Sequence, residues 1–219
     1  RTEQYGEVVQ GLTKIMNRYM TAMTKKIIEN NGTLDKYIGD AQMAFWNAPL
    51  DNDNHAEDSV RTALAMMESL DEFNEEVVSE GIPAFGMGLG INTDTVVVGN
   101  MGSDQRFDYT CLGDGVNTAA RLEGQSKNYG VKILLGPKTA EAVKDDYTIL
   151  ELDNIAVKGK TVGVQIYTVL DSKSATTLAA QKHHEVMHAK YRDQDFEAVM
   201  SYCKSLKLEF GGVMKDYYE

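Results

Sequence analysis

Two long stretches with helical periodicity restrict the fold of this 219-residue sequence more than any other feature. In residues 3–30 and 54–80, apolar side chains recur at steps of three and four, so they share one face of a helix. The stripes consist of Val8, Leu12, Ile15, Met16, Tyr19, Met20, Met23 and Ile27, and of Ala56, Val60, Ala63, Leu64, Met67 and Leu70. "NNG" at residues 30–32 predicts the end of the first helix, and Gly81 and Pro83 predict the end of the second. Two amphipathic helices therefore need an apolar surface to cover.

Short apolar runs between turn signals predict the strands of that surface. Residues 32–49, "GTLDKYIGDAQMAFWNAP", read as a hairpin with Gly39 and Asp40 at its tip. "AFGMGLGINT" and "TVVVGNMG" read as strands joined by a turn at "NTDT", and "RFDYTCLGD" and "VKILLG" as two more. The segment "YTILELDNIAVKGKTVGVQIYTVL" predicts two strands joined at "KGKT". Because helices and strands mix without strict alternation, we predict an α+β fold with helices packed on a largely antiparallel sheet.

The composition changes near residue 172, where we place a domain boundary. A polar stretch, "LDSKSATTLAAQ", reads as a linker. The segment after it predicts two helices that turn near Asp193. They form either one helical-repeat-like pair or a plain helical extension of the domain, and the sequence leaves both interpretations open. The four histidines, His55, His183, His184 and His188, form no recognisable metal or acid–base set, so we expect them on the surface.

Charge and cysteine content exclude several classes of protein. The net charge of −11 argues against a general nucleic-acid binder, because affinity for phosphate backbones comes mainly from Lys and Arg. Two cysteines indicate no disulfide framework. No apolar run approaches the roughly 18 residues of a membrane span, and no signal peptide is recognisable. We therefore expect a cytoplasmic segment without membrane insertion of its own, and leave open whether a parent protein is anchored to a membrane.

Three local patterns offer polar side chains suited to chemistry, and each has an ordinary alternative. Asp40 follows a glycine at a strand-to-strand turn, where a carboxylate suits a hard cation such as Mg²⁺ but is also a common turn residue. Residues 115–128, "GVNTAARLEGQSKN", predict a helix. Asn117 and Arg121 are four apart, so they share one face of it and suit a sugar and a phosphate, but this face can also be an ordinary solvated one. The lysines of "VKGKT" suit a phosphate contact or a plain turn. The glycines of "GMGLGI" lack the helix and lysine of a phosphate loop.

Five short sequence blocks, taken together in their order and spacing, identify a family more specifically than any single block does. "DKYIGDAQMAF", "GLGINT", "VVVGNMGS", "DYTCLGDGVNTAARLE" and "VKGK" together closely resemble the catalytic domain of class III nucleotidyl cyclases of the bacterial adenylate cyclase type. The resemblance covers roughly residues 3–170 and implies a ferredoxin-like-derived sandwich. We accordingly assign residues 1–171 to a cyclase catalytic domain and residues 172–219 to a linker and helical tail.

The resemblance also implies roles for individual residues. Lys36 and Thr110 match the two positions that read the purine. Asn117 matches the residue that orients the ribose, and Arg121 the arginine that stabilises the reacting phosphate. Lys158 matches the lysine that holds the triphosphate tail. These five residues imply ATP as the substrate, and the reaction they imply forms cyclic AMP.

The family's metal site and its dimer explain the charged hairpin. Asp40 matches one of two aspartates that hold two Mg²⁺ or Mn²⁺ ions per site. The family's sites form between two catalytic domains, so in a homodimer Asp40 would serve one site and Lys36 the other. The second aspartate, which ends a strand before the first long helix, has no match in this sequence. We therefore expect the chain as given to be inactive or nearly so, and its parent to be active.

Two other functions remain open from the sequence. A guanylate cyclase is the alternative enzyme. A degenerate cyclase domain that serves dimerisation and regulation is the alternative without catalysis. The unmatched aspartate favours the second alternative, whereas Lys36, Asp40, Asn117 and Arg121 argue against it. Which sensor domains precede this segment in a parent protein cannot be read from it.

Overall fold

The structure of the chain is a computed structural model that describes residues 2–155, 163–170, 173–210 and 212–219, with side chains described from residue 11 onward. Its backbone contacts divide it into two units. Unit 1 comprises residues 1–87 and 97–111, and unit 2 comprises residues 88–96 and 112–219. Within the described residues, no helix is long and apolar enough to cross a membrane.

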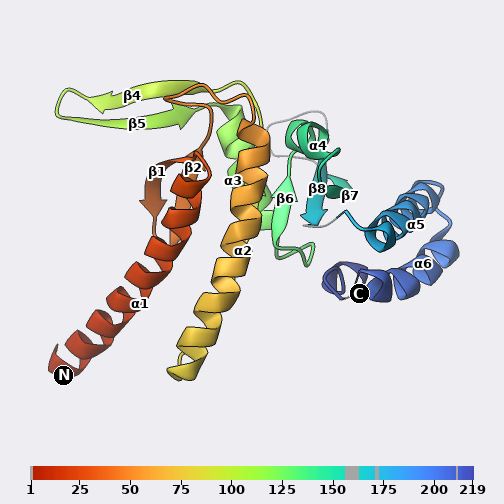
Figure 1. Cartoon of the computed structure of the whole chain (residues 1–219), viewed down its shortest axis with the longest axis horizontal. Coiled ribbons are helices and arrows are strands. Elements are labelled where there is room, and N and C mark those ends of the chain that lie inside the picture. Colours follow the sequence, from red (N-terminus) through yellow and green to blue (C-terminus); the bar gives the residue numbers. More distant parts are fainter. Residues whose placement is uncertain (1, 156–162, 171–172, 211) are drawn as a thin grey trace. The chain divides into compact units, whose positions relative to one another are not determined.

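Unit 1 is built around the two long helices that the periodicity predicted. Helices α1 (Thr2–Glu29) and α2 (His55–Ser79) pack side by side (Figure 1). Their apolar stripes meet in a core that includes Met23, Val60 and Phe73, all nearly fully buried. At the edge of this contact, Arg18 forms ion pairs with Glu76 and Glu80 and lies 5.7 Å from the Phe73 ring centre.

Two hairpins complete unit 1. Strands β1 (Thr33–Ile38) and β2 (Ala41–Phe45) pair antiparallel, as predicted. Gln42 of β2 donates a hydrogen bond to the Met20 carbonyl of α1, which ties the hairpin to the helix. Strand β4 (Val97–Ser103) pairs with β5 (Arg106–Leu112). The sequence placed a turn at "NTDT" between β4 and the "GLGINT" strand, and in the described sheets these two strands do not pair with each other.

Unit 2 contains a four-stranded sheet in the order β3-β6-β8-β7. Its strands are β3 (Leu89–Ile91), β6 (Ile133–Leu135), β7 (Thr148–Ile155) and β8 (Val164–Leu170). β3 and β6 run parallel, and the other pairs are antiparallel. The helices α3 (Asp114–Gln125) and α4 (Pro137–Val143) contact this sheet, which confirms the predicted α+β class.

Gly90 of β3 allows the closest contact between sheet and helix in unit 2. A Cβ atom at this position would lie 2.2 Å from the Ala119 carbonyl oxygen and 2.3 Å from the Glu123 nitrogen of α3. Only glycine lets the two backbones approach this closely. Gly90 therefore sets where α3 lies on the sheet.

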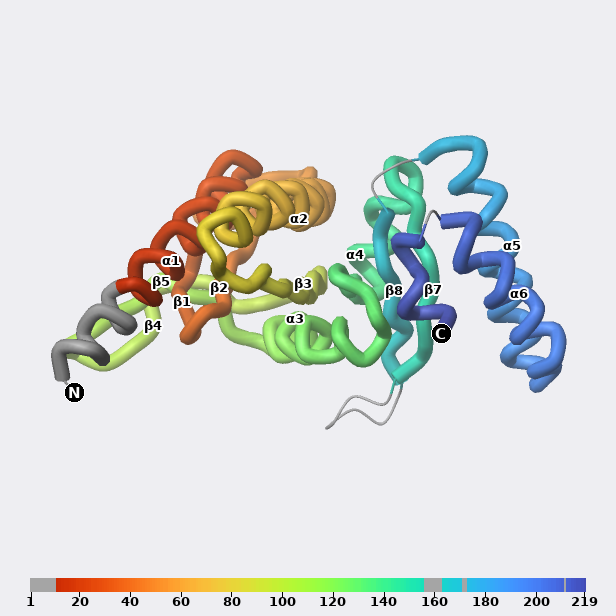
Figure 2. The backbone as a smooth tube through the Cα atoms, turned by 90° about the horizontal axis from the view of Figure 1, so that it is seen from below, coloured from red at the N-terminus to blue at the C-terminus, as the bar shows by residue number. Residues whose placement is uncertain are grey.

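The tail forms the predicted helix pair, α5 (Ala175–Arg192) and α6 (Phe196–Glu209), followed by a short 3₁₀ turn, Asp216–Tyr218 (Figure 2). Ser174 and Thr177 form a capping box that begins α5. The tail shares one apolar cluster with the sheet, made of Leu122, Val131, Leu134, Leu150, Leu152, Ile166, Ala180, Met187, Leu206, Phe210, Met214 and Tyr218. The boundary at residue 172 stays a prediction, and the residues on either side of it pack against each other.

Two of the histidines that we expected on the surface are buried in this contact. His184 and His188 are 1% and 7% exposed. His184 Nε2 donates to the Glu151 carbonyl of β7, so its Nδ1, 2.6 Å from the Tyr218 hydroxyl, is the acceptor. The sequence pattern missed this because the tail's packing partner, β7, is distant along the chain.

Candidate active site

The tip of the β1–β2 hairpin presents Asp40 to solvent. Ile38 pairs with Ala41, so Gly39 and Asp40 form a two-residue turn. Gly39 has φ of 64°, which is the positive value that a type II′ turn requires at its first central position. The Asp40 side chain at this tip is exposed.

A β-bulge lies at the other end of the predicted "DKYIGD" block. Leu34 pairs with Ala44 and Lys36 with Met43, so Asp35 is an extra residue without a cross-strand partner. A bulge redirects the side chain that it inserts. The Asp35 side chain is 0% exposed, whereas that of Lys36 is 40% exposed.

Asp35 joins the two residues that the sequence assigned to purine reading. The Thr110 hydroxyl, on β5, donates a hydrogen bond of 2.5 Å to Asp35 Oδ2. Lys36 Nζ lies 3.3 Å from Oδ1, close enough for an ion pair. Its geometry is not that of a hydrogen bond, and within the described residues Oδ1 has no hydrogen-bond partner. Lys36 and Thr110, 74 positions apart, are thus brought to one buried carboxylate.

The surroundings of this carboxylate are largely closed to solvent. Thr110 is 6% exposed and Cys111 is 4% exposed. Burial, together with the charge of Asp35, raises the pKa of the Cys111 thiol. The rings of Phe45 and Tyr109 lie 5.9 Å apart and pack β2 against β5 nearby. In such surroundings a hydrogen bond to a charged acceptor is well protected from competing water.

In unit 2, Asn117 and Arg121 lie on one face of α3, as their spacing predicted. Asn117 is exposed and Arg121 is half-buried. Neither side chain forms an ion pair or a hydrogen bond with another residue that the structure describes. The opposite face of α3 packs on β3 through the close approach at Gly90. The amide and the guanidinium are therefore available to a ligand.

Lys158 lies outside the described residues. The residues that flank its segment, Asn154 and Gly163, line a hollow of about 400 Å³ in unit 2. Thr118, next to Asn117 in α3, lines the same hollow.

A divalent cation would find one exposed carboxylate at the hairpin tip. Within the part of the chain that the structure describes, no three His, Cys, Asp or Glu residues gather into a metal-binding group. Magnesium in nucleotide sites commonly uses one or two carboxylates together with substrate phosphates and water. Asp40 is a hard oxygen donor and fits such a cation as one ligand.

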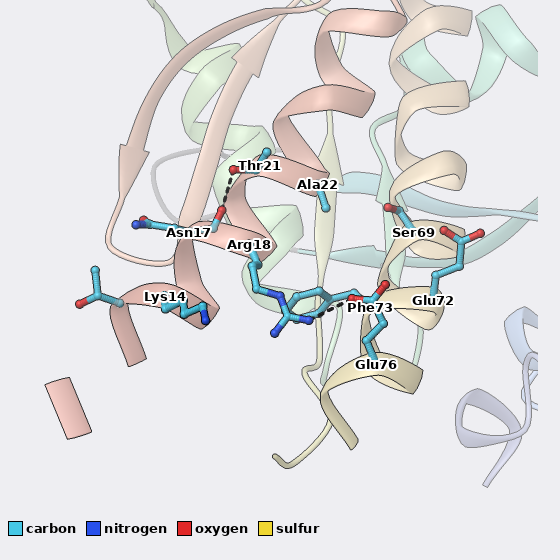
Figure 3. Close-up of a pocket in the computed structure, with 10 residues that line it drawn as sticks. Lys14, Asn17, Arg18, Thr21, Ala22, Ser69, Glu72, Phe73 and Glu76 are labelled. Carbon is cyan, nitrogen blue, oxygen red and sulfur yellow. Dashed lines mark hydrogen bonds and ion pairs between the residues drawn. The ribbon is translucent and has the colours of Figure 1, made fainter. Parts of the chain in front are cut away.

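A hollow of unit 1 is lined by other residues, from α1 and α2 (Figure 3). Its volume is about 840 Å³, and Arg18 and Phe73 are among its lining residues. The guanidinium of Arg18 points to Glu76 across this hollow (Figure 3). The charge of Arg18 is already neutralised by Glu76 and Glu80, so we do not assign this hollow to a nucleotide.

Asp35 is the functional candidate that sequence reasoning missed. Strict alternation along β1 would place Asp35 and Lys36 on opposite faces of the strand. The bulge breaks that alternation and is not visible in the residue pattern. The only signal was the unusual placement of an aspartate beside a lysine in an apolar run.

Comparisons with known proteins find related catalytic domains. A family model described as the adenylate and guanylate cyclase catalytic domain matches residues 4–171. This range nearly coincides with residues 3–170, where the motifs indicated the resemblance. The chain is 34% identical over 165 residues to adenylate cyclase 1 of Rhizobium meliloti, a match that covers 75% of this chain and 25% of that protein. It is 36% identical over 163 residues to an adenylate cyclase of Anabaena cylindrica, covering 71% and 32%.

Solved structures of cyclases also resemble this chain. The adenylyl cyclase CyaB from P. aeruginosa superposes with a TM-score of 0.69 at 34% identity, covering 75% of this chain and 84% of that one. The guanylyl cyclase Cya2 superposes with a TM-score of 0.69 at 30% identity, covering 76% and 83%. The chain spans about a quarter to a third of the length of the two curated relatives.

Proposed function

The chain belongs to the family of adenylate and guanylate cyclase catalytic domains, and on this premise we propose that it converts ATP into 3′,5′-cyclic AMP and pyrophosphate. The observation that supports adenine recognition is the placement of Lys36 and Thr110 at one buried carboxylate. A lysine ammonium only donates, and adenine N1 only accepts. The Thr110 hydroxyl accepts from the adenine N6 amino group. Guanine would instead present its N1–H donor to the Lys36 ammonium.

The reaction is an in-line displacement within one nucleotide. The 3′-hydroxyl oxygen attacks the α-phosphorus as the bond from that phosphorus to the bridging oxygen breaks. Pyrophosphate leaves with the electron pair of that bond, and the hydroxyl proton is released to solvent. Arg121 donates to the α-phosphate oxygens, where negative charge is stabilised in the transition state. Asn117, one helical turn earlier, orients the ribose through its amide. Lys158 holds the triphosphate tail.

Asp40 would hold divalent cations, Mg²⁺ or Mn²⁺, with two per complete site. When bound, the cations supply activation of the 3′-hydroxyl and neutralisation of triphosphate charge. The exposed position of Asp40 lets it reach a nucleotide bound by a second copy of the chain. In the proposed homodimer, each of two equivalent sites combines Asp40 of one chain with Lys36, Thr110, Asn117 and Arg121 of its partner. We also propose that sensor domains precede this domain in a longer parent protein.

The nucleotide preference provides the test. We measure kcat/KM for ATP and GTP with Mn²⁺, using the protein together with the natural sequence that precedes Arg1. The unmutated protein should prefer ATP by about tenfold to a hundredfold or more, because a mispaired buried polar group costs roughly 1–3 kcal/mol. The double variant Lys36→Glu with Thr110→Cys should use ATP less well and raise the relative use of GTP. Turnover of GTP equal to that of ATP would show that Lys36 does not read the base.

A folded, dimeric protein that turns over neither nucleotide would favour the non-catalytic alternative, a dimerisation and regulatory module. The matched control is Lys26→Glu, a charge reversal on α1 at a lysine that pairs with Glu29. This variant should leave the preference between ATP and GTP unchanged.

A further inference from the structure

We propose that Asp35 is a positioning residue that sets the preference for ATP over GTP, by holding the Thr110 hydroxyl as a hydrogen-bond acceptor toward the base. This inference rests on the proposed function and names a residue that the family resemblance did not assign. It follows from three observations: the bulge at Asp35, the burial of its side chain, and the direction of its hydrogen bond with Thr110.

A free threonine hydroxyl discriminates poorly between the two purines. It can accept a hydrogen bond from the adenine N6 amino group, and it can rotate and donate to guanine O6. On its own, Thr110 would therefore add little to the selectivity that Lys36 provides.

Asp35 removes this ambiguity because a hydroxyl has a single proton. The Thr110 hydroxyl donates that proton to Asp35 Oδ2 over 2.5 Å, a short distance typical of a charge-assisted hydrogen bond. Only its lone pairs remain for a ligand. Toward the base, Thr110 is then an acceptor that matches the N6 amino group of adenine and repels the O6 oxygen of guanine.

The second oxygen of the same carboxylate acts on Lys36. Oδ1 lies 3.3 Å from the Lys36 ammonium, which has three N–H donors and keeps at least one for a ligand. One carboxylate thus places a donor and an acceptor side by side. This is the complement of the adenine edge, where N1 accepts and the N6 amino group donates.

The bulge explains why an aspartate can do this from a strand. Asp35 has no cross-strand partner, and its side chain is fully buried next to a threonine from β5. An exposed aspartate would exchange its partners with water. A buried aspartate keeps its hydrogen bond from Thr110, because water cannot replace that bond unless the hairpin opens.

The experiment compares the binding of two nucleotides that cannot cyclise, 3′-deoxy-ATP and 3′-deoxy-GTP, by calorimetry with Mn²⁺. The first variant, Asp35→Leu, cannot accept a hydrogen bond from Thr110. The second, Asp35→Asn, has an amide that can either accept a hydrogen bond from Thr110 or donate one to it. We expect Asp35→Leu to reduce the ratio of ATP-analogue to GTP-analogue affinity by about tenfold, and Asp35→Asn to reduce it by less.

The background variant Thr110→Val separates this role from a structural one. With no hydroxyl at position 110, Asp35→Leu should change the affinity ratio much less than it does in the wild type, because only the contact with Lys36 is then lost. Asp108→Leu is the matched control, because Asp108 is an exposed aspartate on the same strand, β5. It should leave the ratio unchanged. A double-mutant cycle on the unfolding midpoint should show that the effects of Asp35→Leu and Thr110→Val are not additive.

The outcomes distinguish the two proposals. Folded Asp35 variants that retain the wild-type affinity ratio would overturn the role of Asp35 and leave the cyclase function standing. A midpoint cycle that is additive would do the same, because it would mean that the two residues do not interact. Wild-type protein that binds neither nucleotide would contradict the proposed function, and the role of Asp35 would fall with it.

Discussion

At the scale of single residues, the β1–β2 hairpin gives three charged side chains three different surroundings within six positions. Asp35 is fully buried, Lys36 is partly exposed, and Asp40 lies in solvent at the turn. The bulge and the two-residue turn produce this sequence of environments. Each side chain can therefore have its own role even though all three lie on one hairpin.

His184 provides a prediction at the same scale. Burial lowers its pKa to about 4, although its hydrogen bond to the Glu151 carbonyl acts in the opposite direction. In the unfolded chain it takes up a proton near pH 6.5, so between pH 6.5 and 4 the unfolded state binds more protons. The free energy of unfolding should therefore decrease as the pH is lowered. His184 alone should account for a loss of about 2 kcal/mol between pH 7 and pH 5.

Urea unfolding at pH 7 and pH 5 measures this loss as a difference between variants. His184→Gln should lose less stability than the wild type when the pH is lowered. His183→Gln is the control, because its ring is half-exposed and faces Glu209 on the tail surface. Equal losses in wild type and His184→Gln would show that His184 is not kept neutral by burial.

Sequence reasoning assigned site roles only to residues in recognisable motifs, and those roles stay predictions. Lys36, Thr110, Asn117 and Arg121 are recognisable because they stand in fixed motifs. Asp35 and His184 depend on a bulge and on a tail contact, which bring together residues far apart in sequence. Short-range patterns do not report such contacts, so the supporting residues had to come from the structure.

At the scale of elements, α3 depends on β3 for its position. A Cβ atom at Gly90 would collide with backbone atoms of α3, which cannot rotate away as a side chain could. We expect Gly90→Ala to lower the free energy of unfolding by about 1–3 kcal/mol, as overpacked cores do, and to reduce kcat because Arg121 moves with the helix.

Gly124→Ala is the control within the same helix. A Cβ atom at Gly124 meets nothing within 4 Å, so alanine should be neutral or stabilise α3 by about 0.5–1 kcal/mol through its higher helix propensity. Both variants are compared by urea unfolding, and by ATP turnover of the protein together with the natural sequence that precedes Arg1. A Gly90→Ala protein as stable and active as the wild type would mean that α3 has room to move.

The tail helices yield a second prediction for elements. Leu206 of α6 is fully buried in the cluster that the tail shares with β7 and β8, whereas Leu208 on the same helix is 81% exposed. Leu206→Ala should lower the free energy of unfolding by about 2–5 kcal/mol, and Leu208→Ala should change it little. If both variants unfold at the wild-type urea concentration, the tail does not stabilise unit 2.

Helices were predicted more reliably than strand pairing. The two long helices, the helix at residues 114–125 and the tail pair all follow from local periodicity and capping. The partner of β4 does not, because a turn signal such as "NTDT" shows where the chain turns and not which strands pair. Pairing is decided by which apolar faces can be buried together, and that depends on the whole unit.

At the scale of the whole molecule, the proposed dimer divides each site between two chains. A chain with Asp40→Ala retains Arg121, and a chain with Arg121→Ala retains Asp40. Neither variant alone should be active, but an equal mixture should regain about a quarter of wild-type activity, because half the dimers are mixed and have one complete site.

Cyclic AMP formation measures this recovery in the protein together with the natural sequence that precedes Arg1, with subunit exchange verified by labelling. The control mixes the Asp40→Ala chain with a chain that has both substitutions, which leaves no complete site. Mixed dimers without activity would contradict the division of each site between two chains.

The carboxylate at the bulge also limits how this domain could change its substrate in evolution. Guanine recognition calls for a carboxylate at position 36, yet Lys36→Glu would place a second negative charge where the ammonium now lies, 3.3 Å from Asp35 Oδ1. Two like charges this close disfavour each other, because one of them, that of Asp35, is buried. The effect of a substitution at position 36 therefore depends on which residue occupies position 35. A path from ATP to GTP should begin with the loss of Asp35, and a Lys36→Glu variant should melt at a higher temperature once Asp35→Asn is added.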